Sequence, residues 1–464
     1  MPSPGNASPG PSPPPDGLPV PRRYWAIAAI LLAICMSVLD STITNVALPT
    51  IARDFGASAA ASIWVINAYQ LAILVLLLPL ASLGEIVGYR RVSQTGLMVF
   101  TLASLACACA PSLVTLSVAR VMQGIGAAGI MSVNAALVRF TYPQRHLGRA
   151  IGINAFVVGV SAALGPTIAS AVLAVAHWRW LFGINIPLGI LAIAIASYAL
   201  PESEPTRRPL NYVGALLYAG TFGLLLSGLQ SLAHHAATAF ALLQIGAAGA
   251  IGWVLVRHEL PRTTPLIPFD LLRKRQFSLA VATSVCSFMA QMTALVSLPF
   301  EIQRLGHSAV ETGLFMTPWP VGVAVMAPIA GRLADRYRAG VLGGLGLLAM
   351  SAGLALLAFF PASGTAAGFV WCMALCGAGF ALFQSPNNRA MLSQAPRARS
   401  GAAGGMLSTA RLVGQSLGAA GVAILFRIHP QLGSHFALYA AALLAFTAAL
   451  VSMVRLQAEE GIRA

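Results

Sequence analysis

From Tyr24 to its C-terminus, the chain repeats apolar runs of about 20 residues, separated by short connectors that carry arginine. A helix of this length crosses the roughly 30 Å hydrocarbon core of a bilayer. Because that core contains no water, each run must satisfy its backbone N–H and C=O groups internally, as a helix does. The sequence therefore predicts an all-α, polytopic membrane protein.

Composition leads to the same prediction. Hydrophobic residues make up 57% of the 464 residues, charged residues make up 9%, and the mean hydropathy is +0.78. A soluble domain carries roughly 25% charged residues, so a water-exposed surface cannot be built from this chain. Hydropathy and helix-breaking residues indicate fourteen spans. We place them near residues 24–48, 62–83, 92–110, 113–138, 148–173, 178–200, 211–232, 237–256, 277–303, 308–331, 340–360, 366–388, 402–427 and 434–456.

The net charge of +15 raises the alternative of nucleic-acid binding. In the expected topology, however, 22 of the 28 basic residues fall on one side of the membrane. The positive-inside rule makes that side cytoplasmic, so both termini are expected in the cytoplasm and no nucleic-acid partner is expected. The basic residues include a single lysine, and this arginine bias with abundant alanine indicates a bacterial plasma membrane. The cysteines all lie in apolar runs, so we expect neither a disulfide nor a metal site.

Two similar connectors suggest an internal duplication. "ASLGEIVGYRRV" (81–92) follows the second span, and "GRLADRYRAG" (331–340) follows the tenth. Each combines an acid with arginines at a cytoplasmic helix end, where they can form a latch that opens with the inner gate, although a solvated surface loop is the alternative. The gate residues we expect are Glu85, Gly88, Arg90 and Arg91 in the first loop, and Gly331, Asp335 and Arg336 in the second.

With these loops, the chain resembles the major facilitator superfamily, and within it the 14-span drug:proton antiporter branch. The resemblance rests on several motifs in order: "LDSTITNVALP" (39–49), "WVINAYQL" (64–71), "RVMQGIGAAG" (120–129), "GINAFVVGVSAALGP" (152–166), "WRWLFGINIPLG" (178–189) and "SGAAGGMLSTARLVGQSLGAA" (400–420). It implies two six-helix bundles (22–200 and 277–457) with two inserted helices and a cytoplasmic linker between them (201–276). The Pro-, Ser- and Gly-rich start of the chain (1–21) is expected to be a disordered tail, and residues 458–464 a C-terminal tail. The chain departs from the family pattern at Ala81, Glu85 and Ile86 in the first loop, and at Ser161, Ala169 and Ser170 in the fifth span.

Asp40 lies in the middle of the first apolar span. A mid-bilayer charge costs at least roughly 2.5 to 3.5 kcal/mol, so Asp40 must face a cavity or a partner inside the protein. Removal from water favours the protonated carboxyl, which suits proton coupling, and the resemblance implies the same role. The alternative is an aspartate that only binds the hydroxyl groups beside it. A polar stripe on this helix is expected to line the central cavity; it consists of Ser37, Asp40, Ser41, Thr44 and Asn45.

Arg120 and Gln123 lie in the fourth span, and the resemblance implies that the arginine takes part in proton handling. The run "GIGAAG" (124–129) matches a dinucleotide-binding pattern, but it lies inside a membrane helix, where small residues allow close helix packing. The fifth span is expected to act as a hinge between the bundles, through Gly152, Gly159, Gly165 and Pro166.

Two further charged residues are candidates. Glu301 near the outer end of the ninth span is either exposed or able to capture a cation, and Arg411 in the thirteenth span can pair with an acid or with backbone carbonyls.

The sequence thus predicts a secondary active transporter that exports amphipathic or cationic drugs and toxic compounds in exchange for protons, without a cofactor. We expect a lipophilic or cationic small molecule, protons and the lipid bilayer as its partners, and a functional monomer. The alternatives are a major facilitator transporter of a metabolite or siderophore, and a membrane-embedded enzyme or sensor. The longest connector, near 257–276, leaves little room for a catalytic domain.

Overall fold

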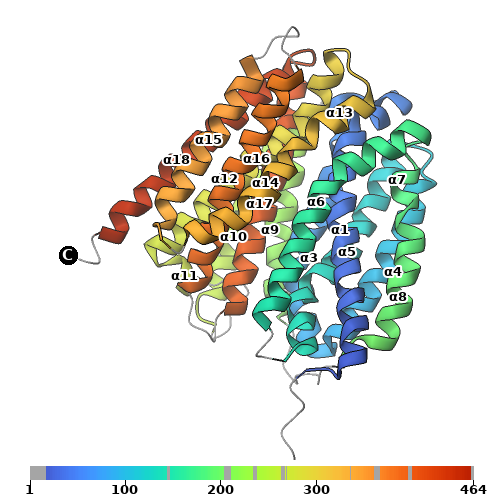
Figure 1. The fold of residues 1–464 in the computed structure, drawn as a ribbon, viewed down its shortest axis with the longest axis vertical. Helices are drawn as coiled ribbons and strands as arrows, with labels where there is room; N and C mark the ends of the chain where they lie inside the picture. Colours follow the sequence, from blue (N-terminus) through green and yellow to red (C-terminus); the bar gives the residue numbers. More distant parts are fainter. Residues whose placement is uncertain are drawn as a thin grey trace, which may run out of the picture.

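The computed structural model describes residues 17–143, 147–202, 211–233, 238–262, 267, 269–334, 336–359, 366–394 and 400–460, and their regular structure is entirely helical (Figure 1). The helices are α1 (Val20–Asp54), α2 (Ala59–Ser62), α3 (Trp64–Val87), α4 (Tyr89–Ala108), α5 (Leu113–Thr141), α6 (Leu147–Val175), α7 (Trp180–Gly183), α8 (Asn185–Ala199), α9 (Tyr212–Ala233), α10 (Thr238–Glu259), α11 (Phe269–Leu272), α12 (Arg275–Arg304), α13 (Ala309–Met316), α14 (Pro318–Leu333), α15 (Ala339–Phe359), α16 (Ala366–Ser393), α17 (Ser400–Ile428) and α18 (Gly433–Glu460).

Thirteen helical segments of the described chain are long and apolar enough to cross a membrane, and each corresponds to a predicted span. Three of them are formed by consecutive helices, namely α2 with α3, α7 with α8, and α13 with α14. The remaining predicted span, near 92–110, corresponds to α4, which has 20 residues but begins with Tyr89, Arg90 and Arg91 and is less apolar. Most of the expected tail lies outside the described residues, and α1 already begins at Val20.

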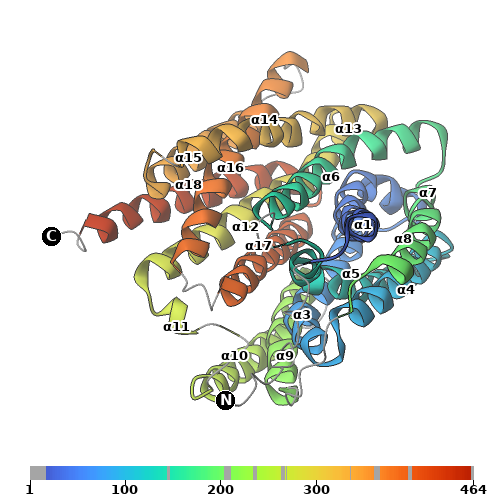
Figure 2. The same cartoon turned by 60° about the horizontal axis from the view of Figure 1, so that its bottom comes forward.

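The long helices form two bundles with a helix pair beside them (Figures 1 and 2). One bundle contains α1, α3, α4, α5, α6 and α8, and the other contains α12, α14, α15, α16, α17 and α18. The pair α9 and α10 packs together, and α9 contacts α3 of the first bundle and α17 of the second. Figure 2 shows this pair at the periphery, against the seam between α3 and α17.

Glycines allow an equivalent close approach in each bundle. In the first bundle, a Cβ at Gly126 of α5 would lie 2.7 Å from the Gly96 carbonyl oxygen of α4. In the second, a Cβ at Gly346 of α15 would lie 2.5 Å from the Gly379 carbonyl oxygen of α16. Since α4 and α5 hold the same places in the first half as α15 and α16 in the second, these contacts support the internal duplication.

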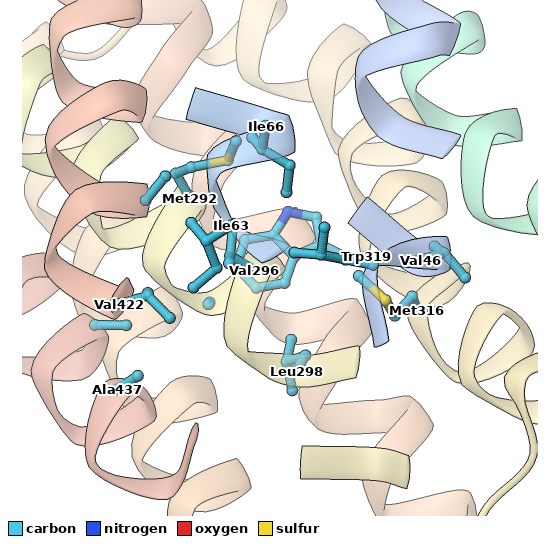
Figure 3. Packing of buried hydrophobic residues seen from close by; sticks show 14 of the residues in the cluster. Val46, Ile63, Ile66, Met292, Val296, Leu298, Met316, Trp319, Val422 and Ala437 are labelled. Atoms are coloured by element: carbon cyan, nitrogen blue, oxygen red, sulfur yellow. The ribbon is translucent and has the colours of Figure 1, made fainter. Parts of the chain in front are cut away.

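A single hydrophobic core joins the two bundles at one end (Figure 3). From the first bundle, this core contains Val46 of α1, Ile66 of α3 and Ile63 just before α3. From the second bundle, it contains Met292 and Val296 of α12 and further residues. Among those are Met316, Trp319 and Val422.

Polar contacts cross the interface at the same end. Arg53 Nη2 donates to Gln303 Oε1 at 3.0 Å, and the hydroxyl groups of Thr167 and Thr317 lie 2.9 Å apart. Elsewhere the buried apolar residues separate into one cluster based on the first bundle and another within the second. The bundles are therefore held closed at the end where α2, α7 and α13 lie, which is the outer end in the expected topology.

Candidate functional site

Asp40 lies inside the first bundle and is removed from solvent, since 1% of its side chain is exposed. The Arg120 guanidinium of α5 forms an ion pair with Asp40 Oδ2, and Arg120 is equally buried. Gln123 Nε2 and Asn185 Nδ2 each donate to Asp40 Oδ1 at 2.9 Å. Both carboxylate oxygens are therefore occupied, by side chains from α5 and α8.

The Arg120 guanidinium has several further partners. Its Nε donates to the Val65 carbonyl oxygen of α3 at 3.1 Å, and its Nη1 donates to Gln123 Oε1 at 2.7 Å. The guanidinium carbon lies 4.1 Å from the Tyr69 ring centroid and 5.6 Å from that of Phe182, distances at which an aromatic face attracts a cation. This network joins α1, α3, α5, α7 and α8 into one polar centre.

Local sequence positions these groups. Ser112 starts α5 with a capping box, in which Thr115 N donates to Ser112 Oγ at 3.2 Å. Arg120 and Gln123 follow three residues apart on one face of that helix. Asn185 is the first residue of α8, separated by one residue from the end of the short helix α7, and from there it donates to the same Asp40 oxygen as Gln123.

Because the Asp40–Arg120 ion pair is buried, the protonation state of Asp40 decides whether Arg120 keeps its counter-charge. Charges removed from water are stabilised only by their partners, and loss of one partner leaves the other as an uncompensated buried charge. A proton on Asp40 would leave Arg120 facing neutral acceptors only, namely Val65 O and Gln123 Oε1. Proton binding and the position of the Arg120 guanidinium are thus physically linked.

The polar stripe on α1 does not act as one cavity-lining surface, and this corrects the sequence-based expectation. Asp40 points toward α5 and α8 within its own bundle. Ser37 Oγ donates to the Ala33 carbonyl oxygen at 3.0 Å, and Thr44 Oγ1 donates to that of Asp40 at 2.8 Å. Ser41 is half-buried, and Asn45 is buried with its Oδ1 unpaired. Helical periodicity predicted that these residues share a face of α1, but it did not predict which helices pack against that face.

Glu301 is neither exposed nor free to capture a cation. Only 7% of the residue is exposed, and Arg304 donates to it through Nε at 3.1 Å and Nη2 at 2.6 Å. Ser434 Oγ of α18 donates to Glu301 Oε2 at 2.6 Å, and His435 lies 3.8 Å away. Glu301 therefore connects the outer ends of α12 and α18. Arg411, in contrast, is half-buried, and its side chain has no hydrogen bond or ion pair in the described structure.

The expected gate loops are only partly described. Gly88 turns the chain between α3 and α4 with φ +101°, a conformation that favours glycine. Arg90 bonds to Glu202 at 2.8 Å and to the Ser197 carbonyl oxygen, not to Glu85, so the first loop is attached to α8 of its own bundle. Glu85, Arg91 and Arg336 are exposed and Gly331 lies in α14, whereas Asp335 is outside the described residues.

Span five corresponds to α6, which packs against α13 and α14 of the other bundle. A Cβ at Gly313 of α13 would collide with Ser170 and would lie 2.6 Å from the Pro166 carbonyl oxygen. Gly165 faces Thr42 of α1, where a Cβ would also collide.

No such close contact is described for Gly152 and Gly159, the other two expected hinge glycines. Gly159 has open space where a Cβ would stand, and Gly152 lies in α6 among residues whose side chains are not described. The observed close approach of α6 to the other bundle is thus at Pro166, toward the outer end.

Sequence analysis missed three polar residues of the network. Asn185 was included in a motif but given no role, Tyr69 OH donates to the Ser37 carbonyl oxygen at 2.9 Å, and Ser104 accepts a hydrogen bond from Gln123 at 2.9 Å. The only signal in the sequence was a polar residue inside an apolar run. This signal is weak, because such a side chain usually forms its hydrogen bond with the backbone of its own helix.

The fold and this buried polar centre define a polytopic helical membrane transporter built from two bundles. The sequence model of the Major Facilitator Superfamily matches residues 30–419, and the chain belongs to that superfamily. It is therefore a transporter and not an enzyme, as the sequence predicted.

The chain is also similar to several individual transporters. It is 52% identical over 444 residues to the uncharacterized transporter YebQ of Escherichia coli K12, covering 95% of this chain and 97% of that protein. It is 30% identical over 404 residues to the riboflavin transporter RibZ of Clostridioides difficile 630, covering 86% and 87%. It is 32% identical over 400 residues to the multidrug resistance protein Stp of Mycobacterium tuberculosis CDC 1551 / Oshkosh, covering 85% and 74%.

Proposed function

We propose that this transporter exports amphipathic toxic compounds across the bacterial plasma membrane in exchange for protons, with both termini in the cytoplasm. The observation that carries the proposal is the buried Asp40–Arg120 pair, a titratable acid held at a permanent cation inside a transport bundle. The similarity to a multidrug resistance protein supports export of toxic compounds. The excess of basic residues on one side of the spans supports the orientation.

In this proposal, a proton binds Asp40 and releases Arg120 from its ion pair. Arg120 then loses its counter-charge in a buried position, so the helices that hold the pair must rearrange. Deprotonation on the other side of the membrane restores the pair. One proton crossing 100 mV supplies roughly 2.3 kcal/mol, equivalent to about a 50-fold substrate gradient.

The closed outer end supports alternating access. The shared apolar core and the contact of α6 with α13 must separate for an outward opening to form. We propose that α6 pivots on α13 where the Pro166 carbonyl faces Gly313, because the glycine has no side chain and only the small Ser170 side chain lies beside the contact. The gate loops between the cytoplasmic helix ends would then close as the outer end opens.

Reconstituted transport tests the function directly. Purified full-length protein in liposomes that contain a pH-sensitive dye should move protons in the direction opposite to an amphipathic fluorescent substrate. An imposed proton gradient should drive substrate uptake against its concentration gradient. The proposal is wrong if uptake occurs equally without the gradient, or if protons and substrate move in the same direction.

Cross-linking the outer end tests alternating access. Arg53→Cys with Gln303→Cys places a thiol on α1 and another on α12, where the native side chains are 3.0 Å apart. A short bis-methanethiosulfonate reagent, which links the two thiols through two disulfides, should block nearly all transport, and a reductant that cleaves these disulfides should restore it. Each single variant, treated identically, controls for reaction at the native cysteines. Full transport by the cross-linked double variant would contradict an opening at this end.

A second candidate function is transport of one specific metabolite, and the similarity to a riboflavin transporter favours it. The two hypotheses differ in selectivity. A metabolite transporter should discriminate strongly among close analogues, because buried polar groups left unpaired by the wrong ligand cost affinity. Competition among chemically unrelated amphipathic compounds for the same transport would favour drug export.

A further inference from the structure

One face of α17 is polar, and its side chains have no hydrogen-bond partners within the described part of the chain. Ser408, Arg411 and Gln415 are spaced three and four residues apart, so they lie on the same side of the helix. All three are half-buried, and none of their side chains has a hydrogen bond in the described structure. Their polar atoms are also not among the fully buried unpaired atoms, so this face borders an open space and not packed protein.

Neighbouring residues on α17 show where this face points. On one side, a Cβ at Gly414 would lie 2.5 Å from the Val285 carbonyl oxygen of α12. On the other, Leu412 belongs to the apolar cluster of the first bundle, and a Cβ at Gly405 would lie 3.4 Å from Leu78 of α3. The polar face lies between these two sides, and α9 covers the α3–α17 seam from the periphery (Figure 2). Arg411 therefore faces the space between the bundles.

A second polar group lies next to this space. Gln70 of α3 is 2% exposed, its Nε2 contacts Met292 Sδ at 3.9 Å, and its Oε1 has no partner. Met292 also lies against α17, since a Cβ at Gly418 would be 3.1 Å from the Met292 Cβ. The shared core containing Ile66 and Met292 closes the outer side of this space.

Arg411 cannot be satisfied by bulk water at the helix end. At 1.5 Å per residue it lies about 16 Å from the beginning of α17 at Ser400, farther than an arginine side chain extends. An intramembrane cation without a partner is costly, and such residues mark the pathway of a ligand.

The other intramembrane charges restrict the ligand's sign. Of the four carboxylates in the middle and outer parts of the described spans, Asp40, Asp54 and Glu301 are paired with arginines, and Glu311 caps the start of α13 by accepting from Ser308 N. No free carboxylate in these parts is available to hold a cationic substrate, whereas the guanidinium of Arg411 is free to hold an anion.

We propose that Arg411 binds the anionic head group of an amphipathic substrate, a carboxylate or sulfonate on an apolar body. This inference rests on the proposed export of amphipathic compounds and changes the expected charge of the substrate from cationic to anionic. Arg411 would contact the head group with paired N–H donors, as guanidinium groups do with carboxylates. Ser408, Gln415 and Gln70 offer further hydrogen bonds, and the shared core would receive the apolar end.

Three matched probes test the charge. We would measure binding of 11-(dansylamino)undecanoic acid, its methyl ester and the corresponding undecylamine to the full-length protein in lipid nanodiscs, with empty nanodiscs as the blank. The wild-type protein should prefer the acid to both others. Arg411→Gln should weaken acid binding by about 10- to 100-fold, the range for a charged hydrogen bond, and leave ester binding unchanged. Arg427→Gln removes a charge from the same helix and should change neither.

Equal binding of the acid and the ester by the wild-type protein, or tighter binding of the amine, would overturn the proposal. So would an Arg411→Gln variant that keeps the preference for the acid. If Arg411→Gln does not fold, Arg411→Lys decides instead, because it keeps the charge and should retain the preference with lower affinity. Binding needs no proton gradient, so preference for the acid in nanodiscs, together with substrate transport that moves no protons in the liposome assay, would support this inference and refute the proposed antiport.

Discussion

Asp40→Asn should abolish proton-driven uphill transport while exchange of substrate across the membrane continues. The asparagine side chain has nearly the same shape but cannot release or bind a proton in the physiological range. Arg120 keeps an oxygen acceptor at this position, and the bundle can still assemble if the Gln123 and Asn185 amides turn so that their oxygens accept from the new NH2 group. We expect net uptake driven by a proton gradient to fall at least about 100-fold, since the step that couples the two fluxes is missing. Counterflow, in which liposomes loaded with unlabelled substrate take up labelled substrate, should persist.

The persistence of counterflow separates loss of coupling from loss of folding. Asp54→Asn provides a matched control, because Asp54 lies at the outer end of the same helix and bonds to Trp178 Nε1 at 2.9 Å, outside the buried network. This variant should keep coupled transport. Uphill transport by Asp40→Asn with an unchanged number of protons per substrate would show that the coupling acid lies elsewhere.

Much of the fold followed from the sequence because the bilayer restricts the choices. An apolar run of sufficient length can only become a helix, and thirteen of the predicted spans appear as such helical segments. Helix pairing was less accessible. The glycine run 124–129 indicated close packing, but nothing in it showed that Gly126 would meet Gly96 of α4, because a helix face does not specify its neighbour.

For the candidate site, too, the sequence identified individual residues but not all of their partners. Asp40, Arg120 and Gln123 were identified because polar residues are costly in a membrane, and the structure brings all three together. Asn185 was missed because its partner is 145 residues away in the sequence. The pairing of Glu301 with Arg304 was not predicted, although their spacing of three on one helix favours an ion pair and could have indicated it.

The network also makes a prediction about stability, since Asp40 and Arg120 compensate each other's charge. Arg120→Met keeps the length of the side chain but leaves the Asp40 carboxylate with only the amide donors of Gln123 and Asn185. Removing one partner of a buried pair costs about 3 to 5 kcal/mol. The neutral pair made by combining Asp40→Asn with Arg120→Met has no charge left to compensate, so it should recover much of this loss.

Denaturation of the four proteins, wild type, both single variants and the double variant, measures this compensation as a double-mutant cycle. We expect Arg120→Met to be the least stable of the four proteins and the double variant to be more stable than it. The coupling energy between the two sites, taken from the whole cycle, should be about 1 to 3 kcal/mol. Arg179→Met is the control, because Arg179 pairs with Asp54 at 3.4 Å in a partly exposed position where an ion pair contributes about 0 to 1 kcal/mol. If the two single effects simply add, Asp40 and Arg120 do not depend on each other's charge. The proposed release of Arg120 by a proton then loses its physical basis, because an arginine that is indifferent to the charge of Asp40 cannot transmit its protonation to the helices.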